Sequence, residues 1–463
     1  MPTFPLITHD SPQQLIAWRD GAPITAARFL ADVERVRVSL PAGVHMLNAC
    51  ADRYRFMVGL AAAITAGKTS LLPSTQTPEM MRHLLQFAPD AFCLADVEKD
   101  AHGLPVCRFP DLDGMAAVDV GKSADRAVPQ IDATQCVAYV FTSGSTGTPL
   151  PHAKRWGALV ANVQAEARLC GLADGRAHAV IGTVPPQHMY GFESTVLIVM
   201  QSGNALVAGN TFYPADICRA VASVPRPRML VSTPIHLRSV LSAGLPLPPV
   251  DRLMSATAPL SPLLAQEAEA AFGAPLVEIY GSTESGQIAL RESVRTQEWQ
   301  LFPDLRFVPR EGVHWVEGGH VETPTPMNDV IEMTAPQRFL LHGRMADLVN
   351  IAGKRNSLAN LNLQLNALPG VVDGAFYMPD EEGADAVTRL AAFVVAPGVA
   401  AADILHGLRQ RMDPVFLPRP LVFVDALPRN ATGKLPREAL RDMAATLTRT
   451  REGRNASEDG SAA

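Results

Sequence analysis

Short apolar runs that alternate with helical stretches recur through the first two thirds of this chain and restrict its possible folds. Residues 56–65 are typical of a buried helix, and residues 262–272 of a second helix. The expected strands are 68–72, 92–95, 137–141, 179–184, 229–232 and 275–280. Strands that alternate with helices favour α/β layers around a mostly parallel sheet. We therefore predict an α/β fold with layered, mostly parallel sheets in a large N-terminal domain.

The pattern changes near Ala346, where a smaller α+β unit of about 100 residues is expected to begin. It contains a helix over 357–368 with Ser357 as its N-cap, a second helix over 401–412, and strands over 390–395 and 420–424. A chain of 463 residues usually divides into more than one domain. We expect an N-terminal domain over 1–345, a mobile C-terminal domain over 346–448, and a disordered tail over 449–463.

Composition excludes several classes of protein. The net charge of -6 and the absence of basic runs argue against nucleic-acid binding. The six cysteines are scattered, without the paired spacing of a zinc site or a disulfide framework. The start of the chain lacks the features of a signal peptide, and the best apolar run, 56–67, is too short to span a bilayer. We expect a cytoplasmic protein.

A loop rich in glycine and hydroxyl side chains follows the apolar strand at 137–141. Gly144 and Gly147 permit close backbone approach, while the side chains of Thr142, Ser143, Ser145 and Thr146 offer hydroxyl donors. The pattern suits phosphate oxygens, although it is not a Walker loop. A solvent-exposed serine and glycine turn is the alternative.

Three further segments carry candidate chemistry. Glu284 follows a Gly-Ser-Thr turn and could hold Mg²⁺, or could be an exposed carboxylate on a capped turn. Arg344 lies in a tight turn that could bind ribose or phosphate, or could form a surface ion pair. Lys434 lies on a glycine-bearing turn, where a lysine is usually solvated surface.

The order and spacing of these four motifs resemble the adenylate-forming superfamily of acyl-CoA synthetases, peptide-synthetase adenylation domains and luciferases. The resemblance covers residues 137–437. It implies an enzyme that activates a small carboxylic acid with ATP and Mg²⁺ and passes the acyl group to a thiol. The acceptor would be CoA or an acyl carrier protein.

The resemblance also implies roles for individual residues. The loop from Thr142 to Pro149 would hold the triphosphate, His188 would border the acyl pocket, and Lys434 would bridge the carboxylate and the α-phosphate. The remaining nucleotide, phosphate and metal contacts would come from Ala256, Tyr280, Gly281, Thr283, Glu284, Asp329 and Arg344. Among these, Tyr280 would stack on adenine, Thr283 would contact phosphate, and Glu284 would bind Mg²⁺. An ionised carboxylate is already nucleophilic, so catalysis rests on positioning and charge neutralisation.

This chain departs from the superfamily pattern in three places. The phosphate loop continues with Leu150 where a lysine is usual, so a lysine contribution would come from Lys154. The usual Tyr-x-Thr-Gly-Asp block is not recognisable, and Asp329 is the nearest match to its ribose-binding aspartate. The hinge position is Ala346, followed by Asp347, where an acidic residue or lysine is usual.

The compact length and the Pro-His-x-Lys continuation resemble a narrower group of bacterial ligases. That group, from aryl polyene and xanthomonadin-type pigment pathways, loads aromatic acids onto an acyl carrier protein. It implies a hydroxybenzoate-like substrate. Two alternatives are an acyl-CoA or aryl-CoA synthetase and a non-catalytic nucleotide-binding homologue.

Overall fold

A computed structural model describes residues 1–73, 75–98, 101–112, 127–143, 149–209, 211–344, 347–351, 354–379, 390–430, 433–436 and 438–446. The chain divides into two compact units. Unit 1 comprises Met1–Thr257, Leu264–Pro326 and Pro336–Arg338, and unit 2 comprises Ala258–Leu263, Met327–Ala335 and Phe339–Ala463. Each unit therefore consists of three separate segments of the chain. A single domain boundary at 345/346 stays a prediction.

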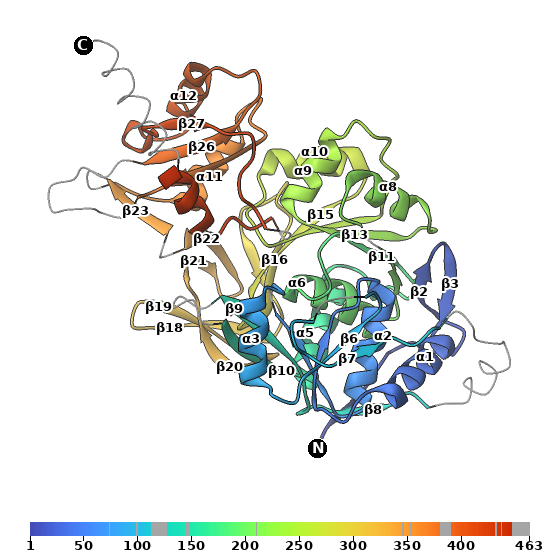
Figure 1. The fold of residues 1–463 in the computed structure, drawn as a ribbon. Coiled ribbons are helices and arrows are strands. Elements are labelled where there is room, and N and C mark those ends of the chain that lie inside the picture. The colour runs from blue at the N-terminus through green and yellow to red at the C-terminus, as the bar shows by residue number, and fades with distance from the viewer. Residues whose placement is uncertain are drawn as a thin grey trace, which may run out of the picture. The chain divides into compact units, whose positions relative to one another are not determined.

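The first sheet of unit 1 has six strands in the order β10-β9-β5-β4-β6-β7. Figure 1 labels β6, β7, β9 and β10 of this sheet. The strands are β4 (His45–Asn48), β5 (Thr69–Leu72), β6 (Phe92–Ala95), β7 (Val106–Arg108), β9 (Cys136–Ser143) and β10 (Pro149–Arg155). All neighbours are parallel except β9 and β10, which form an antiparallel pair. The helices α1 (Ala26–Ser39), α2 (Arg53–Thr65) and α3 (Pro78–Phe87) precede β4, β5 and β6 in the chain. The buried helix and the mostly parallel sheet are as predicted.

The part of the large sheet that lies in unit 1 runs in the order β17-β16-β15-β14-β13-β11-β12-β2-β3. Its strands are β2 (Leu15–Arg19), β3 (Ala22–Thr25), β11 (Ala179–Gly182), β12 (Ala205–Val207), β13 (Arg228–Ser232), β14 (Arg252–Ser255), β15 (Leu276–Ser282), β16 (Gly286–Arg291) and β17 (Trp299–Leu301). From β2 to β15 the neighbours are parallel, in register at Ser232, Ser255 and Glu278. The carboxyl ends of these strands therefore share one edge.

Helices connect the strands of this sheet. They are α5 (Trp156–Leu169), α6 (Met189–Gly191), the π-helix η1 (Phe192–Leu197), α7 (Ile198–Met200), α8 (Pro214–Ala222), α9 (Pro234–Ser242) and α10 (Pro262–Phe272). The bounds predicted for the last of these helices are confirmed.

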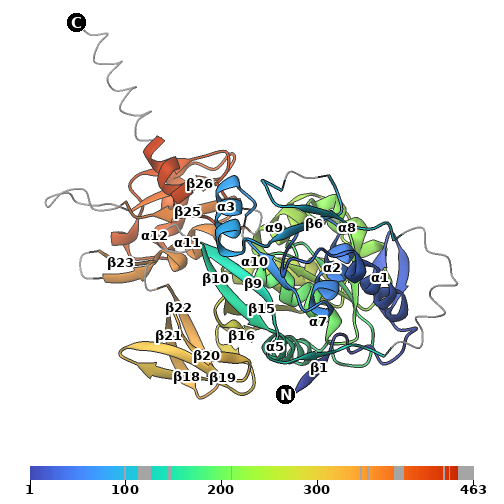
Figure 2. The same ribbon diagram turned by 60° about the horizontal axis from the view of Figure 1, so that its bottom comes forward.

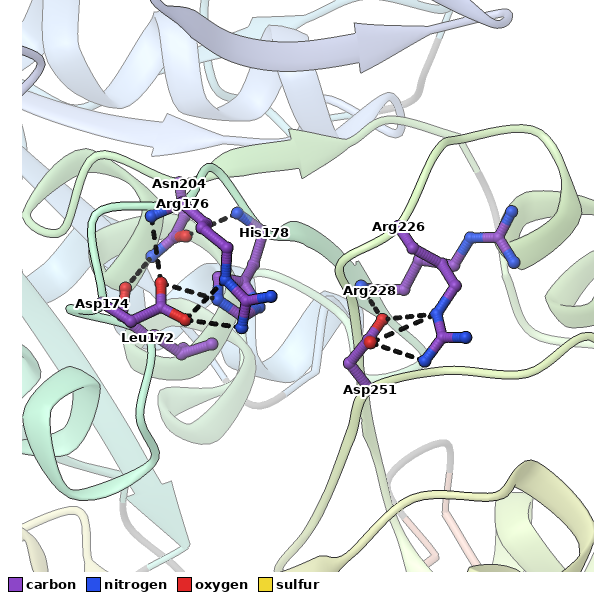
Figure 3. Close-up of polar contacts among 8 residues, drawn as sticks. All are labelled: Leu172, Asp174, Arg176, His178, Asn204, Arg226, Arg228 and Asp251. Carbon is purple, nitrogen blue, oxygen red and sulfur yellow. Dashed lines mark hydrogen bonds and ion pairs between the residues drawn. The ribbon is translucent and has the colours of Figure 1, made fainter.

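Polar side chains hold together the opposite, amino-terminal edge of the large sheet (Figure 3). The backbone N–H of His178, which precedes β11, donates to Asn204 Oδ1 over 2.8 Å. The carboxylate of Asp251, which precedes β14, accepts from the Arg226 guanidinium over 2.6 Å and from the Arg228 backbone N–H over 2.7 Å. These hydrogen bonds hold the segments that lead into β11, β13 and β14. The candidate ligand groups lie at the other end of the strands.

Two smaller sheets complete unit 1. An antiparallel sheet contains β18 (Leu305–Arg310), β19 (Val313–Gly318) and β20 (Val321–Pro326) (Figure 2), and β1 (Thr3–Pro5) pairs with β8 (Gln130–Asp132). The sequence patterns did not indicate the three-stranded sheet, because its strands are only partly buried and lack a continuous apolar run.

Unit 2 is built around a three-stranded sheet in the order β25-β26-β27. Its elements are β21 (Asp329–Ala335), β22 (Arg338–Arg344, of which Arg338 belongs to unit 1), β23 (Leu348–Ile351), β24 (Lys354–Ser357), α11 (Leu358–Asn366), β25 (Asp373–Tyr377), β26 (Ala391–Val395), α12 (Ala401–Arg409), the 3-10 helix η3 (Pro414–Phe416) and β27 (Leu421–Phe423). The predicted N-cap is confirmed, since the Ser357 side chain accepts from the Asn360 backbone N–H. The second predicted helix ends at Arg409, three residues early. The tail over 449–463 lies outside the described residues.

Within the described part of the chain, no helix combines the length and apolar character that crossing a bilayer requires.

Candidate functional site

The carboxyl edge of the large sheet in unit 1 gathers polar groups from consecutive strands. Thr183 follows β11, and its hydroxyl lies 3.1 Å from the Ser232 hydroxyl at the end of β13 and 2.9 Å from His236 Nδ1. Ala256 follows β14, Tyr280 and Gly281 lie at the end of β15, and Thr283 and Glu284 follow that strand. Ligands of open α/β sheets bind at this edge, outside the carboxyl ends of the strands. Five of the residues predicted to form the site, Ala256, Tyr280, Gly281, Thr283 and Glu284, therefore lie along one edge.

The segment after β14 is conformationally unusual. Ala256, predicted to border adenine, is buried with 7% exposure. The next residue, Thr257, has a φ of 79° in the left-handed region, which is unfavourable for a β-branched residue. Backbone strain of this kind persists where the surroundings impose it and clusters at ligand sites.

The ring of Tyr280 packs beside Trp299 on one face of the sheet. Tyr280 and Trp299 have ring centroids 5.5 Å apart, and the Arg291 guanidinium lies 4.4 Å from the Trp299 ring centroid. Arg291 Nε donates to the buried carboxylate of Glu278 over 2.7 Å. Glu278 and Tyr280 are two residues apart in β15 and share a face of the sheet, so the tyrosine ring lies within the same side-chain cluster as Trp299 and Arg291.

A tight turn presents Thr283 and Glu284 between β15 and β16. The Ser285 backbone N–H donates to Ser282 Oγ over 3.1 Å, and the two serine hydroxyls are 3.1 Å apart. Gly281 is required beside this turn, because a Cβ there would lie 2.2 Å from the Gly286 carbonyl oxygen. The sequence thus holds both candidate ligand residues at the tip of a rigid turn.

The hairpin of β9 and β10 contacts this turn. His152 Nε2 lies 3.0 Å from Thr142 Oγ1 and 3.6 Å from Glu284 Oε1, so it links the start of the predicted phosphate loop to the predicted metal ligand. Burial lowers the pKa of His152 more than the nearby Glu284 carboxylate raises it. The Lys154 ammonium donates to the Thr283 carbonyl oxygen. Gly144, Ser145, Thr146 and Gly147, like the Ser143 side chain, lie outside the described residues.

His188 lies just before α6, six residues beyond the end of β11. Its Nδ1 accepts a hydrogen bond from the Tyr190 backbone N–H over 3.3 Å and caps the short helix. The predicted role at the acyl pocket stays a prediction.

The other candidate residues lie in unit 2. Asp329 begins β21, and Arg344 ends β22 with its side chain outside the described residues, as is Ala346. Lys434 is exposed, and its backbone N–H donates to Asn430 Oδ1 over 2.9 Å.

An ion pair anchors the turn that carries this lysine. Arg429 donates to both carboxylate oxygens of Asp373 on β25 over 2.7 and 2.8 Å, and to the Gly433 carbonyl oxygen over 2.9 Å. The backbone beside Lys434 is therefore fixed to the sheet of unit 2.

A model of the AMP-binding enzyme family matches residues 17–330, and one of the AMP-binding enzyme C-terminal domain matches residues 364–434. The chain belongs to the AMP-binding enzyme family. This AMP-binding enzyme is 31% identical over 392 residues to a 4-coumarate–CoA ligase of Rhodobacter capsulatus, covering 79% of this chain and 98% of that protein. It is 24% identical over 370 residues to a 3-hydroxybenzoate–CoA/4-hydroxybenzoate–CoA ligase of Thauera aromatica, covering 70% and 69%.

Solved structures share the fold of this AMP-binding enzyme. ATP-bound MatB from Rhodopseudomonas palustris has a TM-score of 0.78 at 21% identity, covering 94% of this chain and 97% of that one. The o-succinylbenzoate CoA synthetase from Bacillus subtilis, in complex with its acyl-adenylate, has a TM-score of 0.77 at 17% identity, covering 95% and 98%. The predicted fold class and the predicted enzyme class, an AMP-forming acid–thiol ligase that uses ATP, are confirmed.

The described residues of this AMP-binding enzyme fit a Mg²⁺ ion that would take most of its ligands from the ATP phosphates and water. Among the residues that the structure describes, no group of three or more His, Cys, Asp or Glu could hold a metal. Mg²⁺ commonly binds one or two carboxylates and completes its shell with phosphate oxygens and water. Glu284, with a side chain 43% exposed at the turn tip, suits that arrangement.

Sequence reasoning missed a buried polar cluster behind the turn. Glu166 on α5 and Glu193 on η1 are 0% and 2% exposed, and burial raises the pKa of each to about 8. Asn162 Nδ2 donates to Glu193 Oε1 over 3.0 Å, and Lys154 is only 9% exposed. One sequence feature could have indicated this cluster, because Glu166 and Glu193 are each the single carboxylate within a largely apolar run. Glutamate is rarely buried without a partner or a function.

Proposed function

We propose that this enzyme activates an aromatic carboxylic acid with ATP and transfers the acyl group to a pantetheine thiol. The observation that best supports this proposal is the contact between the β9–β10 hairpin and the β15–β16 turn. The contact runs through Thr142, His152 and Glu284. It joins the flank of the predicted phosphate loop to the candidate metal ligand at the carboxyl edge of the sheet. Both relatives are named for aromatic acids, 4-coumarate and the hydroxybenzoates, which supports an aromatic acid as the substrate.

The chemistry follows from the charges involved. A carboxylate oxygen attacks the α-phosphorus, a new oxygen–phosphorus bond forms, and the bond to the β-phosphate oxygen breaks with release of pyrophosphate. Both reactants are anions, so the barrier falls when positive charge and fixed donors meet the developing charge. Glu284 would hold Mg²⁺, which neutralises phosphate charge when bound with ATP.

The protein's own groups serve this reaction by position. The turn held by the Ser282–Ser285 hydrogen bonds would present the Thr283 hydroxyl to phosphate, and Tyr280, packed beside Trp299, would contact adenine. Lys434 would neutralise the reacting carboxylate and the α-phosphate, and the glycine-bearing turn fixed by Arg429 and Asp373 supports its backbone. In the second step the thiolate attacks the acyl carbon, and AMP leaves with the bonding electron pair.

The acceptor has two candidates. CoA is favoured by the relatives, which are named as CoA ligases. An acyl carrier protein, which we expected from the Pro-His-x-Lys continuation, is supported by exposed cations on unit 2, among them Arg409, Arg411 and Arg419. An acidic carrier would be attracted to such a surface, and salt would weaken that attraction because exposed charges are screened beyond about 8 Å at physiological salt.

A competition at equal thiol concentration tests the acceptor. The enzyme, ATP, Mg²⁺ and 4-hydroxybenzoate are mixed with CoA and a phosphopantetheinylated carrier protein, and mass spectrometry measures both thioesters. Earlier formation of the aryl-CoA, with little effect of salt, supports the CoA ligase. Faster loading of the carrier, slowed as ionic strength rises, supports the carrier ligase. Absence of both thioesters while AMP accumulates contradicts the proposed second step.

A further inference from the structure

A cavity of about 230 Å³ lies directly behind the Thr283–Glu284 turn in unit 1. Glu284, Ser285 and Gly286 form one wall, and Met189, the residue after His188, lies on another. A water molecule occupies about 30 Å³ of liquid, so the space exceeds that of a few ordered waters. The cavity therefore adjoins the turn that carries the proposed phosphate and metal contacts, and it reaches the residue after His188, which is predicted to border the acyl pocket. It has room for part of the acid.

The lining of this cavity is charged and buried at its inner end. Lys154, Asn162 and Glu193 line it, and each is more than nine-tenths buried. Burying an ammonium, an amide and a carboxylate is costly unless each has hydrogen-bond partners. Lys154 donates to the Thr283 carbonyl oxygen, which uses one of its three hydrogens.

Asn162 is incompletely satisfied. Its Nδ2 donates to Glu193 Oε1 over 3.0 Å, but within the part of the chain that the structure describes its Oδ1 has no hydrogen-bond partner. The amide is held close to the turn, because a Cβ on Gly286 would lie 2.4 Å from Asn162 Nδ2. A buried acceptor without a partner costs free energy that a ligand donor would recover.

We propose that this cavity receives a ring hydroxyl of the aromatic acid, and that Lys154, Asn162 and Glu193 select it. The inference rests on the proposed function, since it assigns the far end of the same substrate. A hydroxyl group both donates and accepts, so it can give its hydrogen to Asn162 Oδ1 or the Glu193 carboxyl and accept from the Lys154 ammonium.

Other substituents suit this lining less well. A second carboxylate on the acid would be repelled by the carboxylates of Glu193 and Glu284. Lys154 would be the cation near it, because Arg155 at the rim already pairs with Glu322 over 3.2 Å. A chlorine or hydrogen would leave the Asn162 acceptor unpaired. Sites built to hydrogen-bond a substrate hydroxyl reject the analogue that lacks it much more strongly than apolar pockets distinguish a methylene.

The ratio of kcat/KM for hydroxybenzoates to that for benzoate tests this proposal. Pyrophosphate release is measured with 3- and 4-hydroxybenzoate, benzoate and 4-chlorobenzoate. The wild type is expected to favour one hydroxybenzoate over benzoate at least tenfold. Asn162→Leu removes the acceptor while keeping the branching at Cγ, and it should bring the ratio close to one. Gln164→Leu, on the same helix but away from the cavity lining, should keep the wild-type ratio.

Lys154→Met is a second variant that should also lower the ratio. Loss of support for the Thr283 turn affects every acid alike, so it cancels in the ratio. A wild-type ratio near one, or a ratio unchanged in both variants, overturns the proposal.

Binding without turnover separates this inference from the proposed function. Isothermal titration calorimetry compares 4-hydroxybenzoate, 3-hydroxybenzoate and benzoate on the wild type and on Asn162→Leu. If no acid releases pyrophosphate, the proposed function fails. The cavity assignment is still supported in that case if a hydroxybenzoate binds more tightly than benzoate and Asn162→Leu removes the difference. Equal binding of all three acids overturns it.

Discussion

The buried carboxyl of Glu166 should make the stability of unit 1 fall as the pH rises. Burial raises its pKa from an ordinary value of 4.5 to about 8, and the neighbouring Ser194 and Gln287 reduce that shift only in part. The folded state therefore holds the proton more tightly than the unfolded chain. Below pH 4.5 the group is protonated in both states and has no effect. Between the two pKa values only the unfolded state ionises, so stability is lost with rising pH.

The size of this effect follows from the same values. One pKa unit corresponds to about 1.4 kcal/mol, so the free energy of unfolding should fall by roughly that amount per pH unit across this range. By pH 7 the loss attributable to Glu166 is on the order of 3 kcal/mol. Glu166→Gln keeps the shape and the neutral hydrogen-bonding groups without a titrating proton. The excess of the variant's free energy of unfolding over that of the wild type should be small near pH 5 and should grow toward pH 8.

Urea unfolding at several pH values, followed by tryptophan fluorescence, measures this difference. All four tryptophans lie in unit 1, so the signal reports the unit that contains Glu166. Glu267→Gln, an exposed position on α10, is the matched control and should follow the wild-type curve at every pH. Equal pH slopes for Glu166→Gln and the wild type would refute the reasoning.

Three further substitutions test the site. Lys434→Ala should lower adenylate formation about 100-fold or more, while thioester formation from a supplied acyl-adenylate stays largely intact; equal losses in both half-reactions would exclude its assigned role. Glu284→Gln should remove several kcal/mol of transition-state stabilisation in the Mg²⁺-dependent step, and an unchanged kcat at saturating Mg²⁺ would exclude it as a ligand. Gly281→Ala should destabilise unit 1 by about 1–3 kcal/mol, because its Cβ would overlap the Gly286 carbonyl; an unaltered urea midpoint would contradict that packing.

Much of the fold could be predicted because local patterns there agree with tertiary burial. The strand at Phe92–Ala95 is buried at all four positions, so its apolar run is unbroken. The helix Arg53–Thr65 is buried on nearly every side and reads as one apolar stretch. The sheet of β18, β19 and β20 could not be predicted this way, because half-exposed strands have no continuous apolar signal.

The candidate site was predictable where a motif is contiguous in sequence. The Gly-Ser-Thr-Glu turn is such a motif, and the structure holds it by hydrogen bonds among its own residues. The contact from Lys154 to Thr283 joins residues 129 positions apart, and no local pattern indicates it. The same holds for the cavity, since Asn162 and Gly286 meet only after α5 has packed beside β16. The roles assigned from the resemblance alone stay predictions.

Acid-dependent exchange of labelled pyrophosphate into ATP tests the central claim most directly, because it requires reversible adenylate formation and no thiol. The wild-type enzyme with ATP and Mg²⁺ should show exchange with 3- or 4-hydroxybenzoate well above that with acetate or without acid, and Lys434→Ala should abolish it. Exchange that no aromatic acid stimulates, or exchange that is strongest with a short aliphatic acid, would contradict the account.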